Sequence, residues 1–231
     1  IVPTYYKATL NNGINILGTN SSEVPKVYIR LTIEGGALLE DAKRVGLAAF
    51  TAEMMNESTQ NRSSEEISVA LRLLGSSIRF SADDEATYLF IESLTKNLDA
   101  TLELVKEKLF KPAFNEEDFK RIQKQFIESI EAGNKQAQNL ANKAYAKQLF
   151  GDTPFGRSAS PKTIKKIKSK DLKEYYSSFY TPKAASVIVV GDISKEKLLP
   201  KLSFLEDWEG EDVSIPTSKD FDFPEDVQTQ I

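Results

Sequence analysis

The first part of the chain alternates apolar and polar residues, which is the pattern of β-strands that bury one face. Residues 27–33 alternate in this way and end at Gly35 and Gly36. Two earlier segments, 5–10 and 14–19, flank an Asn-Asn-Gly sequence, in which asparagine and glycine tolerate positive φ. We therefore predict a hairpin followed by a third strand at the start of the chain.

Apolar residues then recur three and four positions apart, which is the spacing of one face of an α-helix. Leu47, Phe50 and Met54 follow this spacing and predict a helix over 44–56. A helix of this kind needs a second layer against which its apolar stripe can pack. We expect that layer to be the sheet formed by the preceding strands.

Polar caps and charged first turns indicate where several further helices begin. Ser63 is followed three residues later by Glu66, which is the pattern of a capping box. Asn115 precedes three acidic residues that the helix dipole favours in a first turn, and Ser169 is expected to cap another helix. The remaining predicted elements are strands over 78–82, 87–94 and 186–190, and helices over 63–75, 97–109, 115–150, 169–180 and 194–205.

The order of these elements predicts an α+β domain, in which helices pack on one face of a mainly antiparallel sheet. We assign residues 1–208 to this domain. Residues 209–222 are acidic and show no clear period. We therefore predict that residues 209–231 are a linker and the truncated start of a following domain, with a strand at 227–231. The chain begins with Ile-Val-Pro rather than methionine, and we expect it to be a piece of a longer protein.

Composition excludes several classes of protein and of chemistry. The formal net charge is −4, and the sequence lacks the basic stripe that nucleic-acid-binding proteins carry. A lysine-dense stretch at 162–173 has the spacing of solvated helix faces. No apolar run reaches the roughly 20 residues that span a bilayer. The chain has no cysteine, which excludes disulfides, thiol nucleophiles and cysteine-bound metals, and it has no histidine.

Several short motifs stand in the order found in one peptidase family. They are Leu10-Asn11-Asn12-Gly13, Gly35-Gly36-Ala37, Gly46-Leu47-Ala48, Asn61-Arg62-Ser63, Leu74-Gly75-Ser76, Phe150-Gly151-Asp152-Thr153-Pro154-Phe155-Gly156, Tyr180-Thr181-Pro182 and Val189-Val190-Gly191-Asp192. Across residues 4–205 the chain resembles the M16 zinc peptidases, the group of insulinase, pitrilysin and mitochondrial processing peptidase. The resemblance implies the LuxS/MPP-like metallohydrolase fold. Members carry two or four copies of this domain and enclose unfolded peptides between two half-shells.

Active members of this family carry His-x-x-Glu-His on the first helix. The two histidines bind one zinc, and the glutamate between them activates a metal-bound water. The resemblance places Ala49 and Glu53 at the two ligand positions and Ala52 at the position of the base. A distal ligand, which lies roughly 70 to 80 residues downstream in the family, falls at Glu128 or Ser129. Because a zinc site needs about three protein ligands, we predict no catalytic residue, metal site or cofactor in this chain.

Glu53, Glu57 and Glu128 are candidates for a different cation site. Glu53 and Glu57 are four residues apart and share a helix face. A hard cation such as magnesium or calcium prefers more oxygen ligands than these residues provide. A solvated or ion-paired helix face is therefore the favoured interpretation. A serine or threonine nucleophile would need a base, and the order of residues suggests none.

The resemblance and the altered motif together predict a catalytically silent M16 domain within a larger peptidase assembly. Its expected role is to shape the peptide-binding chamber and to support a catalytic domain or subunit that carries His-x-x-Glu-His and the zinc. The chain alone is expected to be inactive, and the larger assembly to which the resemblance assigns it is expected to be the enzyme. A structural or binding protein of the same fold, without peptidase activity, is the alternative. A non-zinc enzyme is a third hypothesis.

The resemblance also bears on substrate binding and on compartment. In several two-part members the silent half supplies an arginine and a tyrosine that hold the substrate, normally in the domain after this one. No residue of this chain is therefore assigned that role. Bacterial members are often exported, and the Lys- and Asn-rich composition suits a bacterium. The expected location is the bacterial periplasm or cell envelope. The expected ligand is a peptide substrate, and we expect the chain neither to bind nucleic acid nor to span a membrane.

Overall fold

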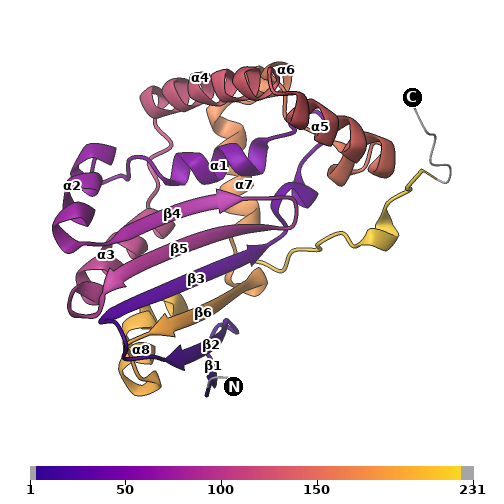
Figure 1. The fold of residues 1–231 in the computed structure, drawn as a ribbon. Helices are drawn as coiled ribbons and strands as arrows, with labels where there is room; N and C mark the ends of the chain where they lie inside the picture. Colours follow the sequence, from indigo (N-terminus) through magenta and orange to yellow (C-terminus); the bar gives the residue numbers. More distant parts are fainter. Residues whose placement is uncertain (1–3, 225–231) are drawn as a thin grey trace.

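Six strands form one sheet in the computed structural model, which describes residues 4–224 (Figure 1). The order across the sheet is β1-β2-β6-β3-β5-β4. Neighbouring strands pair antiparallel except β2 and β6, which run parallel. The strands are β1 (Tyr6–Thr9), β2 (Asn15–Asn20), β3 (Lys26–Glu34), β4 (Ser77–Ala82), β5 (Ala86–Leu94) and β6 (Ala185–Gly191).

The helices pack against one face of this sheet (Figure 1). Along β3, Ile29 faces the core and is 3% exposed, whereas Tyr28 on the other face is 46% exposed. This arrangement confirms the predicted α+β fold. The helices are α1 (Leu47–Met55), α2 (Ser64–Leu74), α3 (Leu98–Phe110), α4 (Glu116–Gly133), α5 (Ala137–Phe150), α6 (Pro161–Lys166), α7 (Ser169–Phe179) and α8 (Lys195–Leu202). Within residues 4–224, none of them has the length and the apolar character needed to cross a membrane.

Helix α1 lies between the sheet and α4 (Figure 1). The side chain of Phe50 on α1 is fully buried. Its ring stacks on those of Phe119 and Phe126 of α4, with centroid distances of 5.2 and 5.8 Å. Burying a side chain of this size contributes roughly 2–3 kcal/mol, so these contacts fix the face that α1 turns toward the core.

The prediction of one long helix over 115–150 is wrong, because this segment forms two helices. Helix α4 ends at Gly133 and α5 begins at Ala137. The N–H of Asn134 still donates to the carbonyl of Ile130 at 2.9 Å, but the following residues form a turn. Glycine and asparagine are poor helix formers, and their succession at this point ends the helix.

Two smaller predictions also need correction. Ser169 is the first residue of α7 and not its N-cap, because the carboxylate of Asp171 accepts the N–H of Lys168 at 2.8 Å and caps the helix. Helix α6 was not predicted. Ser160 caps it, and Pro161 occupies its first position, where the missing N–H of proline leaves no bond unmade. The strand predicted at 227–231 lies outside the described residues.

Candidate functional site

Helix α1 carries the three residues that the sequence places at the zinc-motif positions. Ala52 faces the core and is fully buried, whereas Ala49 is partly buried. Glu53 lies nearer the surface, where its carboxylate accepts a hydrogen bond from the side-chain amide of Asn56 at 3.2 Å. The other carboxylate oxygen lies 3.6 Å from the guanidinium of Arg79 on β4. The one motif residue with a ligand atom is thus already paired with a cation.

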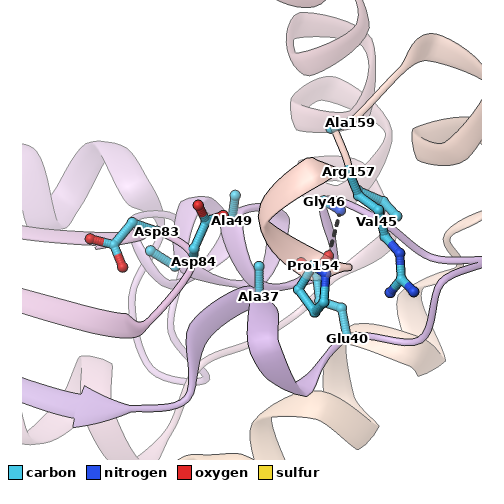
Figure 2. Close-up of a pocket in the computed structure, with 11 residues that line it drawn as sticks. Ala37, Glu40, Val45, Gly46, Ala49, Asp83, Asp84, Pro154, Arg157 and Ala159 are labelled. Carbon is cyan, nitrogen blue, oxygen red and sulfur yellow. Dashed lines mark hydrogen bonds between the residues drawn. The ribbon is translucent and has the colours of Figure 1, made fainter. Parts of the chain in front are cut away.

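Ala49 lines a cavity of about 160 Å³ at the N-terminal end of α1 (Figure 2). In Figure 2, Asp83 and Asp84 from the β4–β5 turn lie on one side of this cavity, and Arg157 from the loop after α5 lies on the other. Glu40 enters from the loop that precedes α1. The cavity is therefore lined by three acidic side chains and one basic side chain, and it contains no nitrogen ligand of the kind that zinc prefers.

The carboxylate of Glu40 holds the N-terminal end of α1. One oxygen accepts the N–H of Ala48 at 2.6 Å, and the other accepts the N–H of Gly46 at 2.9 Å. A negative charge at this end complements the helix dipole. Burial nevertheless raises the pKa of Glu40 to about 7, an effect that the two backbone hydrogen bonds and Arg157 reduce and that Asp84 reinforces. Glu40 is thus a carboxyl group that titrates near neutral pH.

Gly46, the N-cap of α1, is a position that only glycine fits well. Its φ is 100°, in the left-handed region that side chains rarely adopt. A Cβ placed there would lie 2.7 Å from Cδ1 of Ile164 and 3.0 Å from Cβ of Ala159. The glycine therefore lets the start of α1 approach the segment around α6, which closes one wall of the cavity.

The side chain of Lys108 holds the C-terminal end of α1. This lysine belongs to α3, is 2% exposed, and donates to the backbone carbonyls of Met55, Asn56 and Glu57 at 3.1, 2.9 and 3.0 Å. These carbonyls are among those that a helix end leaves without partners. Burial lowers the pKa of Lys108 to about 8, and the nearby carboxylates, first that of Glu57, oppose the change.

Glu53, Glu57 and Glu128, the candidates for a different cation site, do not form a cluster. Glu57 pairs with the guanidinium of Arg121, and Glu128 lies 3.8 Å from Lys124 on the same helix. Ser129 is exposed on α4. Among residues 4–224, no three acidic, histidine or cysteine side chains lie together in a way that could hold a metal ion.

A zinc ion does not fit the residues at these positions. Ala49 and Ala52 offer methyl groups, Glu53 is paired with Arg79, and the sequence contains no histidine. Zinc sites in proteins use nitrogen, sulfur or carboxylate ligands, usually three or four of them. The residues at these positions therefore do not supply a zinc site.

The two residues that hold α1 were not found by the sequence analysis. Lys108 did leave a signal, because it falls on the same helix face as Leu104 and Val105, where an apolar residue is expected. A lysine on a core-facing position needs buried acceptors. Glu40 left no comparable signal, because it stands in a loop among other charged residues.

Two family models match the chain. One, described as insulinase (peptidase family M16), matches residues 16–161, which is more than half of the chain. The chain belongs to the M16 family. The second, described as the peptidase M16 inactive domain, matches residues 166–230. In the structure, β6 from the second match lies between β2 and β3 from the first, so the two matches form parts of one M16 sheet.

Known relatives within the M16 family include both a non-peptidase and a peptidase subunit. The non-peptidase homolog YmxG of Helicobacter pylori is 25% identical over 182 residues, covering 78% of this chain and 42% of the relative. The β subunit of the mitochondrial-processing peptidase of Saccharomyces cerevisiae is 23% identical over 200 residues, covering 86% of this chain and 43% of the relative. The chain thus spans less than half the length of these relatives.

A solved structure shows the same fold. The M16 inactive domain from Pseudomonas fluorescens superimposes with a TM-score of 0.83 at 22% identity, covering 88% of this chain and 50% of that chain. At this identity the similarity establishes the shared M16 fold, and function has to be argued from the site.

Proposed function

We propose that this chain is a catalytically silent M16 domain that shapes the peptide-binding chamber of a zinc peptidase assembly and supports its catalytic half. One observation carries the proposal. Helix α1 is held at both ends by the ionisable side chains of Glu40 and Lys108, while its motif positions hold two methyl groups and an ion-paired carboxylate. The scaffold of the site is present without its ligands, as expected for a domain whose contribution is structural.

In this proposal the zinc belongs to a partner. A domain or subunit with His-x-x-Glu-His would bind the metal and cleave a peptide substrate, and the present chain would complete the enclosure around that substrate. The name of the yeast relative, a subunit of a processing peptidase, supports an assembly of this kind.

Reconstitution with the partner tests the proposal. The chain and the His-x-x-Glu-His protein of the same organism are purified separately and mixed, zinc is measured by mass spectrometry, and cleavage of a fluorogenic peptide is followed. We expect neither stoichiometric zinc nor turnover in the chain alone. We expect the mixture to exceed the partner alone in kcat/KM by at least about tenfold, which corresponds to about 1.4 kcal/mol in transition-state stabilisation.

A partner variant with His-x-x-Gln-His is the matched control, since it keeps the fold and the zinc but lacks the general base. Turnover of the mixture should disappear with this variant. Zinc-dependent turnover by the chain alone would overturn the proposal, because this chain would then itself bind zinc and cleave the peptide.

A structural or binding role without any peptidase is the second candidate. The printed name of the Helicobacter pylori relative, a non-peptidase homolog, favours it. This candidate predicts a stable complex whose formation leaves peptide cleavage unchanged. The same reconstitution therefore separates the two functions by the effect of the chain on kcat/KM.

We also propose that the assembly works in the bacterial periplasm or cell envelope. The motivation is the Lys- and Asn-rich composition together with membership of the M16 family, whose bacterial members are often exported. Fractionation of the source cells followed by immunoblotting tests this location. Recovery of the protein in the cytosolic fraction alone would contradict it.

A further inference from the structure

The segment with the composition of a linker lies against the domain at two places. The first is at its start, beside the entry to β6. The indole N–H of Trp208 donates to the carbonyl of Tyr180 at 3.2 Å, and the hydroxyl of Thr181 donates to the carbonyl of Glu211 at 2.9 Å. Trp208 is itself buried. The segment therefore leaves the sheet in a direction set by these contacts.

The second place is a group of four rings, which we call the phenylalanine clasp: Phe150, Phe155, Phe221 and Phe223. The first two come from the end of α5 and the loop after it. Ring centroids lie 5.9 Å apart for Phe155 and Phe221, and 6.2 Å apart for Phe150 and Phe223. Both pairs are edge-to-face, an arrangement that aromatic rings favour.

A short turn before Phe221 directs the rings of Phe221 and Phe223 toward the domain. The carboxylate of Asp220 accepts the N–H and the hydroxyl of Thr217 at 2.7 and 2.8 Å, which closes a short turn. Beyond this turn Phe221 has an extended backbone. Side chains two residues apart on an extended backbone point to the same side, so Phe221 and Phe223 reach the same surface.

We propose that residues 209–224 are a strap, which the phenylalanine clasp holds on the loop after α5. The strap fixes the path along which the chain leaves the domain, and it braces the loop whose Pro154 and Arg157 line the cavity beside Ala49. Composition alone would make this acidic segment a flexible coil. The aromatic pair at its end distinguishes the strap from such a coil. This inference concerns the docking of the segment and is independent of the proposed function.

Trypsin cleavage after Lys219 reports on the strap, because Lys219 lies in the turn just before the clasp. A protease needs several residues around the cleaved bond to be locally unfolded. The full chain and the double variant F221A/F223A are digested under native conditions, and fragments are followed by intact-mass spectrometry. We expect the double variant to be cut after Lys219 at least about tenfold faster, since both rings that oppose local opening are gone.

Two controls keep the test specific. The double variant V69A/L73A removes two exposed apolar side chains from α2, away from the strap, and should leave cleavage after Lys219 unchanged. Cleavage after Lys135, in the turn between α4 and α5, should be equal in all three proteins. Equal rates after Lys219 in the wild type and in F221A/F223A would overturn the proposal.

Hydrogen exchange gives a second measurement that needs no variant. In the strap, the amides of Thr217 and Asp220 are hydrogen-bonded within the turn. We expect these amides to exchange at least about tenfold more slowly than an unstructured peptide of the same sequence. Exchange at the unstructured rate across residues 217–224 would show that the segment is a free linker.

Discussion

The two ends of α1 are held by side chains of opposite charge, one close to the helix in sequence and the other distant from it. At the N-terminal end, the carboxylate of Glu40 accepts two N–H groups and stands eight positions before one of them in the sequence. At the C-terminal end, the ammonium of Lys108 donates to three carbonyls, the farthest of them 53 positions away. Both charges match the helix dipole, but one contact is local and the other ties α1 to α3.

This difference separates the position of α1 from its chemistry. Neither Glu40 nor Lys108 bonds through the side chains of Ala49, Ala52 or Glu53, because both bind backbone groups at the helix ends. A helix held in this way keeps its place whichever side chains occupy the motif positions. The absence of zinc ligands therefore has no direct cost for the fold.

The largest effect is expected at Lys108. Replacement Lys108→Met keeps most of the apolar stem but leaves three carbonyls at the end of α1 without their donor. Methionine also removes the cost of burying a charge, so the loss is smaller than the sum of three broken bonds. We expect the free energy of unfolding to fall by about 3 kcal/mol, measured by urea denaturation at neutral pH.

Lys106→Met provides the matched control, because Lys106 lies on the exposed side of the same helix. This variant should change the free energy of unfolding by less than about 0.5 kcal/mol. If the two variants behave alike, the C-terminal end of α1 does not depend on Lys108, and the contrast between the two ends disappears.

Features set by local sequence patterns could be predicted, whereas most features that depend on contacts between distant segments could not. Strand alternation in β3 and the capping box at Ser63 follow from local patterns, and both appear in the structure as expected. The break after Gly133 left a local sign that was missed, because Gly133 and Asn134 are poor helix formers and no large apolar residue stands between Ile130 and Leu140. The cavity beside Ala49 could not be predicted, since it forms where three segments distant in sequence meet. Among the long-range contacts, only that of Lys108 was indicated by the sequence, because a lysine on an apolar helix face needs buried acceptors.

A smaller effect is expected at Glu40, and it depends on pH. Burial raises the pKa of Glu40 from 4.5 to about 7, so between these values the folded state holds a proton that the unfolded state releases. The stability from this proton is complete below pH 4.5 and is lost as the pH rises through 7. We expect the wild type to lose about 2 kcal/mol relative to Glu40→Gln between about pH 5 and pH 8, measured by urea denaturation.

Lys108 should give the opposite slope. Its pKa falls from 10.5 to about 8 in the folded state, so its contribution is complete above pH 10.5 and is lost as the pH falls through 8. Comparison of the wild type with Lys108→Met above pH 8 therefore isolates this end of the helix. Parallel curves for the wild type and Glu40→Gln below pH 8 would show that the pKa of Glu40 is not raised in the folded protein.

The smallest effect is expected in the last turn of α1, at the ion pair between Glu53 and Arg79. The side chains of this pair are 36% and 68% exposed, and the charged atoms lie 3.6 Å apart. Exposed pairs of this kind contribute between about 0 and 1 kcal/mol. A double-mutant cycle with Glu53→Gln and Arg79→Met should give a coupling energy below about 0.5 kcal/mol by urea denaturation. A coupling of about 2 kcal/mol would mean that the motif positions also hold the helix, and its position and chemistry would then not be separable.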